Sequence, residues 1–242
     1  IGATTWGYMQ KGYDEARKAG AAAIILRLNT YGGTVVHADS IRTLILNSSM
    51  PVYAFIDNNA ASAGALIAIS CDSIYMREGA NIGAATVVNQ TGKAMPDKYQ
   101  SYMRATIRST AEAQGYDTVY TVSGDTEVHW RRNPQIAEAM VDERIVVPGL
   151  CDSTKVLTLT AREALQWGYC EAIAESVDDI ITSRIGYWQY KVEQFEPSFY
   201  DDLVGFLQNP VVQGILIMLI IGGIYFETVS YTHLRAHETS QD

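Results

Sequence analysis

Short apolar runs alternate with helical patterns in the first part of the chain, and this alternation restricts the fold more than any other feature. Residues 23–28, 51–56 and 73–76 are short and apolar, as expected of buried strands. Between these runs, the sequence predicts helices at residues 36–46 and 62–69. Strands that are joined through helices form right-handed crossovers, so the sequence predicts an α/β fold with a parallel sheet.

Further elements are expected before this core and after it. The Ala-rich stretch 14–23 is interpreted as a helix that ends at Gly20, and Ile1 is expected to lie inside a strand. Residues 81–84 are expected to form a turn. Residues 96–114 are predicted to form a helix with one apolar face, whose members recur every four residues: Tyr99, Met103, Ile107 and Ala111.

The following segment combines a polar stretch with three more predicted elements. Residues 115–133 are polar and rich in turn formers, so we expect a surface loop, followed by a short helix at 134–141. Residues 156–159 are predicted to form a strand, and Thr160 with Glu163 three positions later forms a capping-box pattern for the next helix. Residues 176–185 read as a last amphipathic segment.

The C-terminal part has a different composition. Residues 203–226 carry no charged side chain, and a bilayer is spanned by roughly 20 apolar residues. We therefore expect a folded domain at 1–185, an aromatic and acidic linker at 186–202 and a membrane segment at 203–228. A buried core helix is the alternative, but it is disfavoured because the polar elements of the domain all come before it.

The final residues, 229–242, replace the apolar pattern abruptly. They read like translated sequencing adapter, and we interpret them as a non-native tail. The alternative is a polar tail that follows a membrane helix. On either interpretation, His233 and His237 are not assigned to a metal site, and no metal site is expected elsewhere.

A glycine pair, Gly32-Gly33, follows the first predicted strand. Glycine allows a backbone N–H to approach a substrate carbonyl closely, so the N–H groups of Gly33 and Ala63 are candidates for an oxyanion hole. An ordinary turn between a strand and a helix is the alternative for the pair taken alone.

Ser62 lies between a predicted strand and a predicted helix. A side-chain oxygen at this point is close to the unpaired N–H groups and the positive end of the helix dipole, which favour a developing anion. The small residues on both sides, including Gly64, leave room for the backbone of a substrate. Serine is also among the commonest N-cap residues, so a purely structural role is the alternative.

Lys98 is the candidate base. It falls in the first turn of a predicted helix, beside the expected apolar face, and both burial and a helix N-terminus favour the neutral amine. The alternatives are a solvated surface lysine and the neighbouring Lys93, which lies in a predicted loop. His37 and His129 lack convincing spacing for a Ser-His-Asp triad, so a Ser-Lys dyad is preferred.

The overall charge and the cysteines limit the function classes. The net charge of −9 gives the chain no electrostatic basis for binding nucleic acid. Cys71, Cys151 and Cys170 are far apart and form no C-x-x-C pair, so the sequence indicates neither a zinc site nor a disulfide framework. No cofactor is expected.

These motifs together resemble the NfeD proteins, membrane-anchored serine proteases related to Clp protease and signal peptide peptidase A. The resemblance covers nearly all of residues 1–227. The segments that carry it are 29–33 (Asn-Thr-Tyr-Gly-Gly), 61–64 (Ala-Ser-Ala-Gly), Lys98, 156–164, Asn209-Pro210 and 223–227. It implies the Clp protease/crotonase fold, a spiral of ββα units, followed by a C-terminal transmembrane helix. It also implies that the chain lacks part of the first strand and later membrane and β-barrel parts.

The resemblance also implies roles for individual residues. Ser62 matches the nucleophile, Lys98 the general base, and Gly33 and Ala63 the oxyanion hole. The neighbouring residues Tyr31, Gly32 and Gly64 are expected to contact the substrate. The implied substrates are hydrophobic protein segments, the implied partner is a stomatin-like membrane protein, and the catalytic domain is expected outside the cytoplasm. We also expect a homo-oligomer.

Two other functions are compatible with parts of this pattern. A crotonase-like acyl-CoA enzyme would use the same oxyanion geometry, but it would need acidic catalytic residues and a pocket for CoA instead of an activated serine. An inactive membrane scaffold that binds a stomatin-like protein would need neither Ser62 nor Lys98.

Overall fold

The computed structural model describes residues 1–120 and 126–238, and the side chains of these residues except 119, 120 and 230–238. The chain forms two compact units, Ile1–Glu193 and Gln194–Asp242. The first unit contains a mixed six-stranded sheet, in agreement with the predicted α/β class. The expectations for the tail at 229–242, with His233 and His237, concern side chains that lie almost entirely outside the described part.

The sheet is built around one long central strand, β2 (Val52–Ala61). β1 (Ile24–Thr30) and β3 (Ser73–Met76) pair with it in parallel, and so does β4 (Asn81–Gly83), which meets its last three residues. The short strands β7 (Thr158–Thr160), antiparallel to β4, and β8 (Ala172–Ile173), parallel to β3, complete the sheet. The predicted parallel core is therefore confirmed.

Helix α3 (Ala63–Ser70) lies at the centre of the packing. All eight of its residues are buried, because small and aliphatic side chains surround it completely. It contacts α2 (Val35–Leu46) and α4 (Asp97–Ala113), which bury Ile41 and Met103 in the same core. The predicted helices at 36–46, 62–69 and 96–114 therefore correspond to α2, α3 and α4.

Several shorter helices complete the first unit. The predicted capping box forms at α6 (Ala161–Gln166), where Thr160 Oγ1 accepts a hydrogen bond from the Glu163 amide at 3.3 Å and the Glu163 carboxylate accepts one from the Thr160 amide at 2.9 Å. Other short helices of this unit are α5 (Pro134–Ala139), α7 (Val177–Asp179) and a π-helical turn, η1 (Ile180–Ile185).

The prediction for the beginning of the chain was wrong in its extent. Helix α1 (Ala3–Ala19) begins at the third residue, so Ile1 lies outside any strand, and Gly20 ends the helix in the left-handed conformation with φ 65°. Trp6 and Met9 pack against the core and hold the first turns of α1 in place. Their helical spacing is diluted by glycines, which explains why the sequence pattern is weak there.

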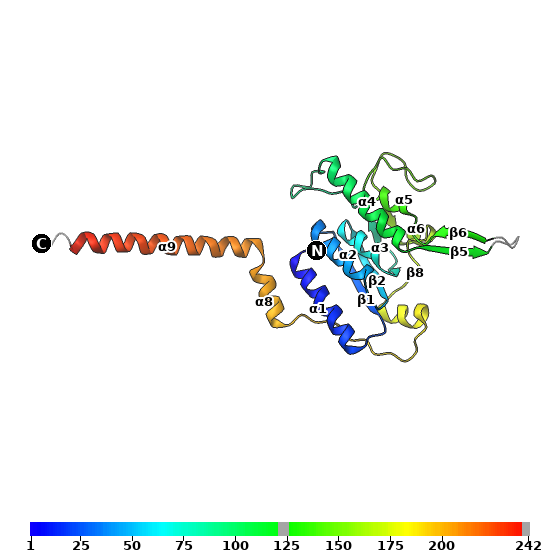
Figure 1. Ribbon diagram of the computed structural model, residues 1–242, viewed down its shortest axis with the longest axis horizontal. Coiled ribbons are helices and arrows are strands. Elements are labelled where there is room, and N and C mark those ends of the chain that lie inside the picture. The colour runs from blue at the N-terminus through cyan, green and yellow to red at the C-terminus, as the bar shows by residue number, and fades with distance from the viewer. Residues whose placement is uncertain (121–125, 239–242) are drawn as a thin grey trace. The chain divides into compact units, whose positions relative to one another are not determined.

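Two further predictions need correction. Residues 115–133 contain a hairpin of β5 (Tyr116–Tyr120) and β6 (Thr126–Trp130), where a loop was expected; it extends away from the sheet and its helices (Figure 1). All five residues of β6 are exposed, so burial produces no alternating pattern in the sequence. The expected turn at 81–84 contains strand β4.

The second unit contains two helices, α8 (Phe199–Leu207) and α9 (Pro210–Glu238). Asn209 precedes Pro210, and its side-chain oxygen accepts a hydrogen bond from the Val211 amide at 2.9 Å, which caps the second helix. By length and composition, Pro210–Val229 is apolar enough to cross a membrane. The uncharged stretch 203–226 therefore belongs to two helices.

Candidate active site

Ser62 occupies a strained turn between β2 and α3. Its backbone has φ 56° and ψ −118°, a combination that residues with a side chain rarely adopt and that costs of order 1–3 kcal/mol. The Ser62 amide donates a hydrogen bond to the Gly83 carbonyl at 2.9 Å, which helps to hold the turn. The Ser62 side chain makes no capping hydrogen bond to the helix, so the N-cap alternative does not account for this serine. Strained strand-to-helix turns of this kind present nucleophilic serines in hydrolases.

The glycine turn packs directly against Ser62. Gly32 has φ 121°, and a Cβ atom at this position would lie 2.8 Å from Ser62 Cβ and 3.2 Å from Ser62 Oγ. A side chain at residue 32 would therefore displace the serine. The Gly32 amide donates to Thr30 Oγ1 at 3.1 Å, which fixes the turn at the end of β1.

The Gly33 amide is available for a ligand. Within residues 1–120 and 126–238 it has no hydrogen-bond acceptor, whereas the next amide, that of Thr34, donates to the Ile1 carbonyl at 3.0 Å. A Cβ atom on Gly33 would lie 2.0 Å from the same Ile1 oxygen, so only glycine fits there. Ala63 is the first residue of α3, and its N–H therefore has no acceptor within the helix.

A cavity of about 50 Å³ adjoins Ser62. Its walls contain Gly33, Ser62 and Ala63 together with mostly apolar side chains, namely Val35, Ala38, Ala85, Thr86, Val87, Val88 and Met103. The apolar walls come mainly from the start of α2 and from residues 85–88, with Met103 of α4. The cavity therefore has room for a small apolar group beside a hydroxyl and two backbone donors.

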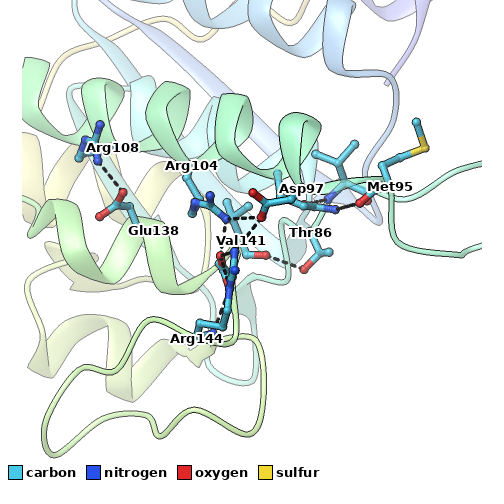
Figure 2. Close-up of polar contacts among 11 residues, drawn as sticks. Thr86, Met95, Asp97, Arg104, Arg108, Glu138, Val141 and Arg144 are labelled. Carbon is cyan, nitrogen blue, oxygen red and sulfur yellow. Dashed lines mark hydrogen bonds and ion pairs between the residues drawn. The ribbon is translucent and has the colours of Figure 1, made fainter.

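Gln100 holds one wall of this cavity. Its side-chain oxygen accepts a hydrogen bond from the Val87 amide at 2.9 Å, and its side-chain nitrogen donates to the carbonyls of Val87 at 2.7 Å and Met95 at 3.1 Å. Thr86 is attached separately, because its hydroxyl donates to the Val141 carbonyl at 2.9 Å (Figure 2). Helix α4 thus fixes the main chain at Val87 through Gln100, and Val141 holds the Thr86 side chain.

A cluster of charged residues anchors the first turn of α4. Asp142 is only 8% exposed and forms ion pairs with Arg104 and with Arg144, the latter at 2.7 Å. Arg144 also pairs with Asp97, the first residue of α4, at 2.8 Å, as Figure 2 shows. Hydrogen bonds from the Arg144 side chain are the main reason why the pKa of Asp142 is lowered to about 2. The carboxylate therefore stays charged at neutral pH.

The structure brings the predicted serine and the predicted oxyanion donors together, but Lys98 lies differently from the expectation. Lys98 is in the first turn of α4, as predicted, but it is exposed and does not line the cavity. Its ammonium nitrogen lies 4.9 Å from the centre of the Tyr99 ring. Of the expected apolar face, Met103, Ile107 and Ala111 are buried as predicted, whereas Tyr99 is exposed and Gln100 is buried.

The remaining candidates are placed as follows. Tyr31 is 82% exposed, beside the glycine turn. Gly64 is buried, and a Cβ atom there would meet Thr30 Cγ2 at 2.6 Å, so close packing of α3 on β1 already requires glycine. His37 forms a hydrogen bond with Thr34 Oγ1 at 2.6 Å, and His129 is in the exposed hairpin.

Sequence reasoning missed the polar residues that support the site. Gln100 could have been found, because a polar side chain three positions before Met103 lies on the apolar face of the helix. Asp142 and Arg144 are far from Asp97 in the sequence, and only the fold brings them together.

Comparisons with known proteins agree with this fold. A family model described as "NfeD1b, N-terminal domain" matches residues 2–194. Membrane protein NfeD1b of Bacillus subtilis (strain 168) is 31% identical over 224 residues, which cover 92% of this chain and 47% of that protein. Membrane-bound protease PH1510 of Pyrococcus horikoshii is 28% identical over 227 residues, covering 84% of this chain and 45% of that protein. The chain spans about half the length of these curated relatives.

Solved structures show the same likeness. The 1510-N membrane-bound stomatin-specific protease, solved as a lysine-to-alanine mutant with a substrate peptide, has a TM-score of 0.66 and 26% identity over 86% of this chain and 92% of that chain. ClpP1 from Listeria monocytogenes, with a TM-score of 0.51 and 14% identity over 74% of this chain and 89% of that chain, shares the fold. The α/β fold is thus of the Clp protease type, and the chain belongs to the NfeD1b family, whose N-terminal domain it contains.

Proposed function

We propose that this chain is the proteolytic part of a membrane-anchored serine endopeptidase, with Ser62 as the nucleophile. The observation that carries the proposal is the strained Ser62 turn, which lies against the glycine turn and beside an apolar cavity. Related proteins support it, since one is named a membrane-bound protease and another a stomatin-specific protease. Two solved mutants of that second protease have alanine in place of a serine or of a lysine. These are the residue types of Ser62 and Lys98.

The proposed reaction is acyl transfer to Ser62 followed by hydrolysis. Lys98, as the neutral amine, takes the proton from Ser62 Oγ, and the oxygen attacks the carbonyl carbon of the peptide bond. The N–H groups of Gly33 and Ala63 hold the oxyanion. The protonated Lys98 then gives its proton to the departing amine. In the second half of the reaction, water attacks the acyl-enzyme while Lys98 accepts its proton, and Lys98 returns that proton to Ser62 Oγ as the ester bond breaks.

Lys98 has to approach Ser62 for this chemistry. Lys98 is exposed at the beginning of α4, and catalytic hydrogen bonds often form only when a substrate binds. The segment 86–95, which lies between the cavity wall and Lys98, forms a β-bridge between Val88 and Ala94. We propose that a bound peptide draws the exposed part of this segment and the Lys98 side chain toward Ser62, while the anchored backbone of the first turn of α4 stays in place.

The cavity suggests the substrate class. Its walls are mostly apolar and its volume of about 50 Å³ is small, so the residue whose carbonyl is attacked has a small apolar side chain. We propose hydrophobic protein segments as substrates and a stomatin-like membrane protein as partner. We also propose that the catalytic domain lies on the outer side of the membrane and that the enzyme acts as a homo-oligomer.

A cleavage assay with matched variants tests the proposal. The detergent-solubilised chain is incubated with a library of hydrophobic peptides, and Ser62 is probed in parallel with a serine-reactive phosphonate. Ser62→Ala and Lys98→Ala should both abolish cleavage, whereas Lys93→Ala, which changes an exposed loop lysine, should retain it. Labelling and cleavage that survive in Ser62→Ala would contradict the assignment.

A folded chain that neither cleaves peptides nor reacts with the phosphonate would favour the scaffold alternative. The exposed position of Lys98 is the observation that keeps this alternative open. Binding of a stomatin-like protein without cleavage would then be the activity to measure.

A further inference from the structure

Helix α8 (Phe199–Leu207) is a separate short helix in front of the candidate membrane span. A capping box begins it, because Ser198 Oγ accepts a hydrogen bond from the Asp201 amide and the Asp201 carboxylate accepts one from the Ser198 amide at 3.0 Å. It ends at Leu207, before the Asn209-Pro210 pair that starts α9. Proline cannot continue a preceding helix, so α8 and α9 are two elements with different surroundings.

The two faces of α8 differ completely in polarity. Successive residues are rotated by about 100° around a helix axis, which places every apolar side chain of α8 on one side. This apolar face consists of Phe199, Tyr200, Leu203, Val204, Phe206 and Leu207. The opposite face consists of Asp201, Asp202 and Gly205. Such segregation is typical of a helix that lies at a boundary between water and an apolar medium.

Among the described residues, the side chains of the apolar face of α8 are exposed. Phe199 and Tyr200 are each 76% exposed and Phe206 is 60% exposed, and none of the nine residues of α8 is buried. Exposed apolar residues on this scale mark a surface that contacts something else. The question is what covers it.

The position of α8 in the chain identifies the covering medium. Only residues 208 and 209 separate it from Pro210–Val229, the segment that is long and apolar enough to span a membrane. A helix attached so closely to a span begins at the membrane surface, where aromatic rings such as those of Phe199 and Tyr200 are favoured. Because α8 has two aspartates and no Lys or Arg, apolar burial has to provide the contact without attraction to anionic lipids.

We propose that α8 lies in the plane of the membrane surface, with its apolar face among the lipids and Asp201, Asp202 and Gly205 toward water. This inference rests on the proposed membrane attachment through α9, but it does not depend on proteolysis. An in-plane helix directly before the span fixes the depth at which the chain leaves the membrane.

Lipid-quenching measurements on the full chain test this arrangement. Single cysteines are placed on the apolar face (Leu203→Cys), on the polar face (Asp202→Cys) and within α9 (Ile217→Cys), and each is labelled with an environment-sensitive fluorophore. Cys71, Cys151 and Cys170 are buried, so labelling of the folded chain is selective for the new cysteine. The labelled chains are inserted into phosphatidylcholine vesicles that contain lipids with a nitroxide either near the headgroup or deep in the acyl chain.

The three positions should give different results. The label at residue 203 should be quenched at least about twofold more by the shallow nitroxide than the label at 202, and the label at 217 should be quenched most by the deep one. Partial replacement of phosphatidylcholine by phosphatidylserine should leave the result at 203 unchanged. Phe206→Cys provides a second position on the apolar face.

Other outcomes would overturn the proposal in distinguishable ways. Equal quenching at 202 and 203, with strong deep quenching at 217, would mean that α9 is inserted but α8 is not in the surface. A disulfide that forms between copies of Leu203→Cys, without quenching, would show that a second copy covers the apolar face. Absence of quenching at 217 would refute membrane attachment and this inference with it.

Discussion

At the scale of single residues, the site depends on backbone conformation more than on charge. Ser62 is held at φ 56°, and the surrounding core supplies the free energy that keeps it there: β2 and α3 are both buried on either side of the turn. Gly32, with φ 121°, approaches the serine so closely that no side chain fits between them. The chemistry of Ser62 therefore relies on two unusual backbone positions next to each other.

Replacing Ser62 by glycine should reveal the strain. Ser62→Gly and Ser62→Ala both remove the hydroxyl, but only glycine adopts a positive φ without cost, so Ser62→Gly should be more stable than Ser62→Ala by about 1 kcal/mol. This difference corresponds to about 2–4 °C in the midpoint of thermal unfolding. Equal midpoints for the two variants would show that the turn is not strained in solution.

Gly32→Ala should impair the serine without unfolding the domain. The new Cβ would lie 2.8 Å from Ser62 Cβ, so the serine has to move, and phosphonate labelling should slow about tenfold or more. Gly79→Ala is the matched control, because Gly79 has φ +85° and open space around it. Similar labelling rates for the two alanine variants would contradict the role of this contact.

At the scale of elements, helices α3 and α4 position the site. Helix α3 is held at both of its ends. The N-terminal end of α3 carries Ser62, and its C-terminal end is capped by Arg132, whose guanidinium is 2% exposed. Arg132 Nη1 donates to the carbonyls of Ile69 at 3.0 Å and Cys71 at 2.6 Å, and Nη2 forms an ion pair with Glu171 at 3.3 Å. Burial lowers the pKa of Arg132 and raises that of Glu171. Burial is therefore unfavourable for both charged groups of this ion pair. The hydrogen bonds that Arg132 donates offset that loss of solvation.

Arg132→Met should destabilise the domain strongly. It leaves the buried carbonyls of Ile69 and Cys71 without their donor and Glu171 without its cationic partner. A loss of about 3 kcal/mol is expected, or about 6–12 °C in the unfolding midpoint. The neighbouring Arg131, which is 40% exposed and 3.5 Å from Asp117, provides the control: Arg131→Met should change stability by less than about 1 kcal/mol. Equal effects of the two substitutions would refute the capping role of Arg132.

The anchor of α4 should show itself in the dependence of stability on pH. The pKa of Asp142 is lowered from 3.8 to about 2 in the folded state, so its ion pairs stabilise the fold above pH 4 and this contribution disappears as the pH falls from about 4 to 2. The contribution is about 1–2 kcal/mol after screening by solvent. Urea unfolding should therefore show a difference between wild type and Asp142→Asn at pH 5 that shrinks toward pH 2. A difference that is independent of pH would exclude a titrating Asp142.

Much of this arrangement can be predicted from the sequence. Where one side of a helix or strand is buried, apolar residues recur along the sequence with the period of that element. The strands and helices between residues 24 and 76 follow from their apolar runs, and Ser62, Gly33 and Ala63 meet because parallel strands end at the same edge of the sheet. Strand β6 is exposed along its whole length and therefore has no such pattern. The ion pairs of Asp142 join distant segments, so no local pattern predicts them.

At the scale of the whole molecule, the candidate site and the candidate membrane span lie in different units of the chain. Residues 1–193 contain the sheet, the strained serine and the cavity, and residues from 194 onward contain α8 and the candidate span α9. The core clusters of the first unit are composed entirely of residues up to Ile185.

This division predicts that the first unit folds without the second. A chain truncated after Glu193 should remain in the soluble fraction, and its unfolding midpoint should lie within about 3 °C of that of the full chain in detergent, because no core residue is removed. Phosphonate labelling of Ser62 should persist in the truncated chain, whereas only the full chain should stay with membranes after an alkaline wash. If the truncated chain aggregates or unfolds more than about 10 °C lower, the core must depend on contacts from residue 194 onward, and the two units are one cooperative structure.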